Sequence, residues 1–125
     1  MRYRRLSYGY ALVVSHAALP TQTAWRPTTD VYETPTSVSV TVELAGVAPE
    51  ELDVLFFDNA VVVEGQRRLP ALDSGGIFHA AEIRRGQFRL EIALPSPVNA
   101  EPVEMRSDMG MLFIRLTKSG TAAEG

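Results

Sequence analysis

The chain has 125 residues, of which 46% are hydrophobic and 22% charged, with a net charge of -3 and no cysteine. This length fits one domain, which buries roughly two-thirds of its surface and needs no covalent staples. The lack of cysteine excludes disulfides and the common thiolate metal sites. No apolar run approaches the roughly 20 residues of a membrane helix, so we expect a soluble protein with no membrane partner.

The charges are distributed unevenly along the chain. Between Arg26 and Arg67 there is no Lys or Arg, whereas eight residues of this stretch are acidic. An acidic surface of this kind repels a phosphate backbone. The arginines that follow, up to Arg89, are better explained as solvated sheet edges and ion pairs of a dimer. We therefore expect no nucleic-acid partner.

Residues 1–24 differ from the rest of the chain. Apolar residues at helical spacing predict a short helical stripe, which would be marginal on its own: Leu6, Tyr10, Val13, Val14 and Ala17. Three early arginines followed by an apolar run also allow a secretory signal. We favour a third interpretation, in which this segment is an adaptable apolar arm that contacts a partner.

From Trp25 onward, alternation of apolar and polar residues predicts strands. The clearest case is 37–44, and similar patterns occur at 52–57, 61–65 and 112–117. The stretch 78–98 is predicted to hold the long central strand, with Gly86 at a bend and prolines at its end. Asp58-Asn59 predicts a tight hairpin, and 30–33 and 103–106 predict short strands. Seven or eight short strands indicate an antiparallel β-sandwich.

Residues 66–77 form a region that is long for a hairpin connection. It contains Pro70, Asp73, Ser74 and two glycines, and loops of this length tend to be functional. After the last predicted strand, residues 119–125 form a short polar tail.

Eight short motifs in order make this chain similar to a known family. They are Trp25-x-Pro27, Asp30–Thr34, Glu43–Val47, Pro49–Leu52 with Val54, Val61-x-Val63-x-Gly65, Glu82 with Gly86-x-Phe88, Leu94-Pro95-x-x-Val98, and Gly110–Ile114. Over residues 25–118 the sequence resembles the α-crystallin domain of small heat-shock proteins. The resemblance implies an all-β, immunoglobulin-like antiparallel sandwich (residues 25–118) between a short arm (1–24) and a truncated tail (119–125).

The resemblance also implies a function. It predicts a stress-related, ATP-independent holdase that binds unfolding client proteins, is not an enzyme, needs no cofactor and works in the cytoplasm. It implies a homodimer formed by strand exchange through residues 66–77, with a small higher oligomer as a further option. The expected dimer-interface residues are Leu69, Leu72, Phe78, Glu82, Arg84 and Arg85.

Client or partner binding is expected at two places. One is the arm, through Leu6, Tyr10, Val13 and Val14. The other is a groove that resemblance places between the strands of Val54, Phe56 and Met105. As alternatives, Val54 and Phe56 are simply core residues, and the arm is tucked into its own dimer.

The chain departs from the family pattern at two informative positions. Leu90 stands where the family usually has an arginine, and Arg85 or Arg89 are the candidates to replace its ion pairs. The tail lacks the usual Ile-x-Ile/Val motif and has no Ile, Val or Leu at all. The groove could therefore be vacant for a client or for another protein's tail, and a large shell is not expected.

Catalytic and metal-binding motifs are weak. His16 and His79 lie far apart in sequence, and nothing frames Ser74, His79 and Asp73 as a nucleophilic triad. Glu50-Glu51 lacks an apolar pocket, and Gly75-Gly76 lacks the lysine of a phosphate loop. An enzyme is therefore not expected.

Two other binding functions stay open at the level of sequence. A p23-like co-chaperone has a similar sandwich, but it lacks the exchanged loop and usually carries an acidic tail. An extracellular sandwich module for adhesion or carbohydrate binding would need a cleaved signal at the N-terminus.

Overall fold

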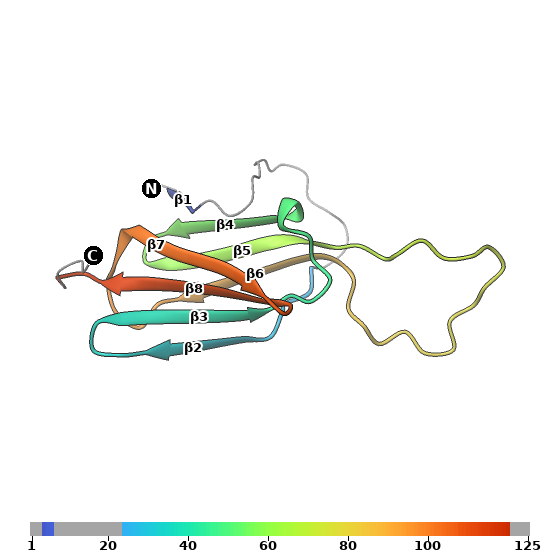
Figure 1. Cartoon of the computed structure of the whole chain (residues 1–125), viewed down its shortest axis with the longest axis horizontal. Helices are drawn as coiled ribbons and strands as arrows, with labels where there is room; N and C mark the ends of the chain where they lie inside the picture. The colour runs from blue at the N-terminus through green and yellow to red at the C-terminus, as the bar shows by residue number, and fades with distance from the viewer. Residues whose placement is uncertain (1–3, 7–23, 121–125) are drawn as a thin grey trace.

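The computed structural model describes residues 24–120 and the backbone of residues 4–6. In this part of the chain it contains eight strands and one short 3-10 turn, η1 (Pro49–Glu51). The strands are β1 (Arg4–Leu6), β2 (Thr29–Glu33), β3 (Ser37–Glu43), β4 (Leu52–Phe57), β5 (Ala60–Arg67), β6 (Gly86–Ala93), β7 (Val98–Asp108) and β8 (Met111–Lys118) (Figure 1).

The strands form two four-stranded antiparallel sheets. The first has the order β1-β4-β5-β6 and the second the order β2-β3-β8-β7. All strand pairs in both sheets are antiparallel. The predicted all-β sandwich is thus confirmed.

Alternating side chains from both sheets build the core. Val38, Val40 and Val42 of β3 are fully buried. They belong to one apolar cluster that also includes Val61 and Val63 of β5, Phe88, Leu90 and Ile92 of β6, and Leu112, Ile114 and Leu116 of β8. The period of two residues in each strand puts these side chains on the inner face of its sheet.

The hairpin between β4 and β5 closes as predicted. Asp58 and Asn59 have φ values of 48° and 57°, the left-handed backbone of a two-residue hairpin turn whose twist matches the flanking strands. Asparagine and aspartate tolerate this conformation better than most residues. The turn fixes the register from Leu52↔Gly65 to Phe57↔Ala60.

Two strand predictions were wrong in extent. β7 covers Val98–Asp108, much more than the predicted 103–106. Pro102 interrupts its sequence pattern, and its register against β8 shifts between Val98 and Val103. The central strand β6 is shorter than predicted because residues 78–85 pair with no strand of the described chain, and β6 begins only at Gly86.

The segment before β2 covers the free edge of β6. The Trp25 N–H donates to the Gln87 carbonyl (3.1 Å), and the Arg89 N–H donates to the Trp25 carbonyl (3.1 Å). The indole Nε1–H of Trp25 donates to the Gly86 carbonyl (3.2 Å). Its ring also packs against Phe88, with centroids 5.3 Å apart. An edge strand that would otherwise expose unpaired backbone groups is thereby closed.

The N-terminal arm is described only at Arg4–Leu6, where it is a strand and not part of a helix. Residues 7–23, including Tyr10, Val13 and Val14, lie outside the described residues. Among the described residues, no helix is long and apolar enough to cross a membrane.

Candidate protein-binding site

The outer edge of β4 is paired with the N-terminal strand. β1 runs antiparallel to β4, with Arg4, Arg5 and Leu6 opposite Phe56, Leu55 and Val54. The sequence predicted that this part of the groove could be vacant. The structure instead places the chain's own strand on the β4 edge.

Beneath this edge lie the residues expected to line the groove. Val54 is only 1% exposed and belongs to the core, which agrees with the alternative interpretation of this residue. Phe56 of β4, and Val103 and Met105 of β7, are half-buried and pack against the same core cluster. These three side chains present apolar surface without being fully enclosed.

A small depression joins the beginning of β4 to the end of β7. Leu52 and Ser107 both line it, and its volume is about 10 Å³. That is space for about one water molecule. This depression is therefore too small to hold a side chain of a bound segment.

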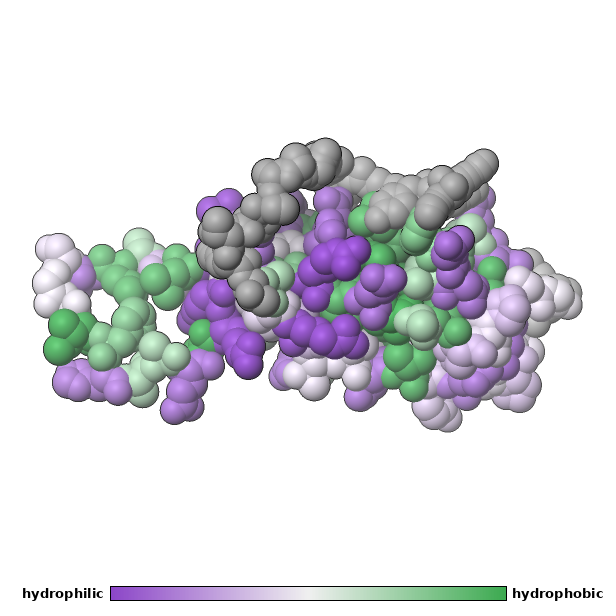
Figure 2. Space-filling model, turned by 180° about the vertical axis from the view of Figure 1, so that it is seen from behind, coloured by the Kyte–Doolittle hydropathy of each residue, from purple (hydrophilic) through white to green (hydrophobic). Residues whose placement is uncertain are grey.

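A second surface is the loop of residues 68–85, which projects from the sandwich between β5 and β6 (Figure 1). Five of its large apolar side chains are exposed: Leu69, Leu72, Ile77, Phe78 and Ile83. Ile77 is 76% and Phe78 60% accessible. Figure 2 shows hydrophobic residues along this projection. A projecting segment with this much exposed apolar surface is typical of an interaction site.

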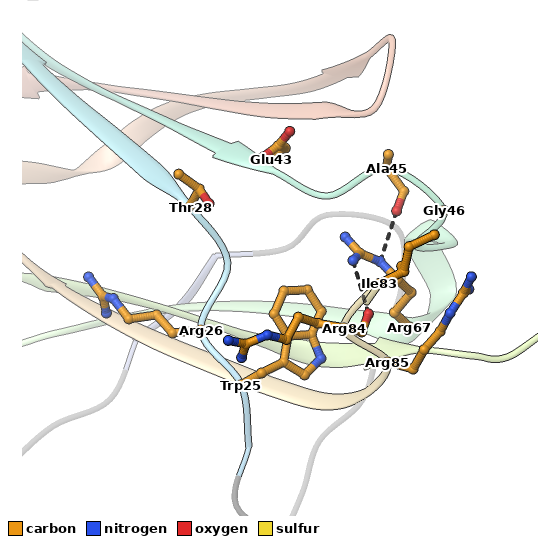
Figure 3. A pocket seen from close by; sticks show the side chains of 10 residues that line it. All are labelled: Trp25, Arg26, Thr28, Glu43, Ala45, Gly46, Arg67, Ile83, Arg84 and Arg85. Carbon is orange, nitrogen blue, oxygen red and sulfur yellow. Dashed lines mark hydrogen bonds between the residues drawn. The ribbon is translucent and has the colours of Figure 1, made fainter. Parts of the chain in front are cut away.

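Hydrogen bonds between the two ends of the loop fix its root. Arg67 Nη1–H donates to the Arg84 carbonyl (3.1 Å), and Arg85 Nη1–H donates to the Arg68 carbonyl (3.2 Å). Arg67 Nε–H also donates to the Ala45 carbonyl (3.0 Å) (Figure 3). The loop therefore leaves the domain from a defined base.

At the root of the loop lies a cleft of about 600 Å³ that is lined by several arginines. The guanidinium of Arg67 lies 4.5 Å from the centroid of the Trp25 ring, within cation–π range. Burial lowers the pKa of the Arg67 guanidinium, the charge of Arg85 lowers it further, and Glu43 opposes both. The cleft is lined by Trp25, Arg26, Thr28, Glu43, Ala45, Gly46, Arg67, Ile83, Arg84 and Arg85 (Figure 3).

Exposed ion pairs link neighbouring segments around this cleft. Arg68 Nε lies 2.8 Å from a carboxylate oxygen of Glu51, and hydrogen bonding to Glu51 raises the pKa of Arg68. Arg89 Nε lies 3.1 Å from Glu64, and its Nη1 lies 3.6 Å from Glu91. Of the two candidates to replace the family arginine, Arg89 therefore forms carboxylate pairs. Arg85 instead donates to the backbone carbonyl of Arg68 at the loop root.

Leu90, at the family arginine position, is 1% exposed in the core. A leucine fits there because its neighbours in the cluster are apolar, and it needs no partner charge.

The residues with catalytic potential do not form a site in the described part of the chain. His79, Ser74 and Asp73 are all exposed on the projecting loop. No group of three or more His, Asp or Glu residues among the described positions could hold a metal ion. His16 lies outside the described residues.

The structure separates the predicted site residues into two groups. Val54, Phe56 and Met105 lie in or against the core, and Val54 and Phe56 are the register partners of Leu6 and Arg4. The six expected dimer-interface residues all lie on the loop and are all exposed. Sequence reasoning missed the loop-root contacts of Trp25 and Arg67, for which the single tryptophan of the chain was the only available signal.

Comparison with known proteins identifies this arrangement. A solved structure of heat shock protein 16.0 from Schizosaccharomyces pombe superposes with a TM-score of 0.70 at 27% identity, covering 80% of this chain and 93% of that one. The hspA protein from Xanthomonas axonopodis also superposes with a TM-score of 0.70, at 25% identity, covering 80% of this chain and 100% of that one. The fold is that of the small heat-shock proteins.

The sequence comparisons agree. Residues 30–124 match the model of the Hsp20/alpha crystallin family, and the chain belongs to that family. Small heat shock protein C2 of Rickettsia felis is 28% identical over 92 residues, which are 74% of this chain and 60% of that protein. The chain thus spans less than two-thirds of that relative's length. The family consists of non-enzymatic chaperones that typically bind clients and form oligomers.

Proposed function

We propose that this chain is an ATP-independent holdase that binds unfolding proteins and prevents their aggregation under stress. The observation that carries the proposal is the family fold with a projecting loop whose large apolar side chains are exposed. A holdase needs apolar surface that it can expose while charged residues keep it soluble. No ATP is needed because binding exposed apolar surface requires no chemical step.

The proposed working unit is a homodimer formed by strand exchange. β2 is the edge strand of its sheet, with Val31 and Tyr32 exposed. A loop segment from a second copy would extend this sheet as an added strand. It would cover the exposed apolar side chains of β2 and of the loop itself. The acidic Asp30 on β2 also complements the arginines at the loop ends. Leu69, Leu72, Phe78, Glu82, Arg84 and Arg85 are the proposed interface residues.

The loop also favours this function over a p23-like co-chaperone, which lacks the exchanged segment. We propose the cytoplasm as the location. Relatives are named as peroxisomal in Oryza sativa and chloroplastic in Chlamydomonas reinhardtii, so family membership alone does not decide the compartment.

Client binding is proposed to use the arm as well as the β4 edge. Replacing Val13 and Val14 with serine should weaken the protection of heat-denatured citrate synthase tenfold or more, because fully burying each valine side chain contributes about 1.5–3 kcal/mol. Light scattering of the client without nucleotide measures the effect. The matched control, Val13→Ile with Val14→Ile, keeps the apolar area and should protect normally.

The circular dichroism spectrum of both variants should equal that of the wild type. Unchanged protection by the serine variant would move client binding away from the arm.

A further inference from the structure

The cleft at the root of the loop concentrates positive charge. Its charged lining residues are four arginines and a single glutamate: Arg26, Arg67, Arg84, Arg85 and Glu43. The chain as a whole has a net charge of -3. The arginines come from the stretch before β2, from the end of β5 and from the end of the loop (Figure 3). The fold therefore gathers like charges that are far apart in the sequence.

The cleft arginines lack the carboxylate partners that neighbouring arginines have. Arg68 pairs with Glu51 at 2.8 Å, and Arg89 pairs with Glu64 at 3.1 Å. None of the four cleft arginines forms an ion pair with another residue of the described chain. Like charges held together without a counter-charge raise the free energy of the protein, and a bound anion would lower it.

Most of the guanidinium donors in the cleft are also available. Each guanidinium has five N–H donors, and Arg67 and Arg85 use only a minority of theirs on backbone carbonyls. The side chains of Arg26 and Arg84 make no hydrogen bond to another residue of the described chain. Guanidinium groups bind phosphate oxygens through two parallel N–H bonds, so these two side chains suit a phosphate group.

We propose that this cleft binds a small phosphate-bearing anion with two or more negative charges, either an inorganic phosphate chain or a bisphosphorylated metabolite. Its volume of about 600 Å³ lies within the usual range of small-molecule sites. Arg26 and Arg84 are the proposed primary contacts, and the hydroxyl of Thr28, which also lines the cleft, adds a neutral donor. The site goes beyond the proposed holdase function and does not depend on it.

The bound anion would tie the projecting loop to the sandwich. Arg26 precedes β2, whereas Arg84 lies at the end of the loop, so a ligand that contacts both links two distant segments. A ligand that binds only the folded arrangement stabilises it. The melting temperature of the protein should therefore rise when the anion is added.

Titration of the full-length protein with sodium tripolyphosphate at low ionic strength tests the proposal. Trp25 is the single tryptophan and lines the cleft, so its fluorescence reports binding at this site. Arg26→Gln with Arg84→Gln should weaken binding by about tenfold or more, because charge-assisted hydrogen bonds are lost. The matched control, Arg106→Gln with Arg115→Gln, removes the same charge from exposed arginines outside the cleft. It should bind within about twofold of the wild type because salt screens distant charges.

A variant that strengthens binding gives an independent test. Glu43 is the only carboxylate of the lining and would repel the anion. Glu43→Gln should therefore tighten the binding of tripolyphosphate several-fold, which a damaged fold would not do. Where circular dichroism shows the arginine double variant to be misfolded, the comparison of Glu43→Gln with the wild type decides.

A second probe, fructose 1,6-bisphosphate, separates the two sources of the anion. Tighter binding of tripolyphosphate assigns the site to an inorganic phosphate chain, and tighter binding of the bisphosphate assigns it to a phosphorylated metabolite. Either result supports the site, as does a higher melting temperature of the wild type with either probe. Undetectable binding of both probes, or equal affinity of the wild type, the cleft variants and the control, would overturn the proposal.

Discussion

Replacing Phe88 with alanine is expected to lower the free energy of unfolding by about 4 kcal/mol, the usual cost of deleting a buried phenylalanine ring. Phe88 is 1% exposed and is among the largest fully buried side chains. Its ring packs against Trp25 on one side. On another it lies over Gly65, where an added Cβ would come within 2.8 Å of Phe88 Cζ. Removing the ring therefore leaves a cavity and loosens the segment that closes the β6 edge.

Urea unfolding at a fixed protein concentration measures this loss, because the stability of an oligomer depends on concentration. Phe88→Leu is the matched conservative variant and should cost less than about 1.5 kcal/mol. Gln87→Ala, at the exposed neighbouring position, should change stability by less than about 0.5 kcal/mol. A loss below about 1 kcal/mol for Phe88→Ala would contradict the packing described for this edge.

Deleting Leu69–Ser74 is expected to convert the proposed dimer to a monomer. The deletion removes two exposed leucines and shortens the loop, so that its remainder can no longer reach the β2 edge of a second copy. The sandwich should survive because the loop root is held separately by the Arg67–Arg84 contact. Multi-angle light scattering measures the mass, and circular dichroism checks the fold.

The matched control is Asp73→Asn with Ser74→Ala, which keeps the loop length and its leucines and should stay dimeric. A deletion variant that remains a dimer would show that the contact between copies does not use the exchanged loop.

The sequence predicted best where local pattern and tertiary structure agree. Val38, Val40 and Val42 alternate with polar residues and are all fully buried, because a strand in a sandwich has one face on the core. The hairpin at Asp58-Asn59 was predictable because few residues tolerate its backbone. Each of these features depends on residues close together in the chain.

The failures occur where distant or absent partners decide the structure. The spacing of Leu6 with later residues indicated a helix, but pairing with β4 makes Arg4–Leu6 a strand. The stretch 78–98 was expected to hold one long strand, but a strand needs a neighbour, and among the described residues the segment 78–85 pairs with none. β7 is longer than predicted because pairing with β8 overrides the interruption at Pro102.

The candidate site was predictable only in part. The order of the motifs correctly pointed to the β4 strand and to the loop as parts of the candidate site. The exposure of each side chain could not be deduced from residue type, because Val54 is in the core whereas Phe56, two residues further along β4, is half-buried. The strand that covers the β4 edge had no sequence signal, since three residues carry too little alternation to distinguish it from a coil or a helix.

The most direct test of the proposed function is the mass of the wild-type protein by multi-angle light scattering, with aggregation of heated citrate synthase followed in the same preparation without ATP. The account predicts a dimer or a small oligomer that suppresses aggregation. A monomer that gives no protection would contradict it and would favour a co-chaperone or an adhesion module.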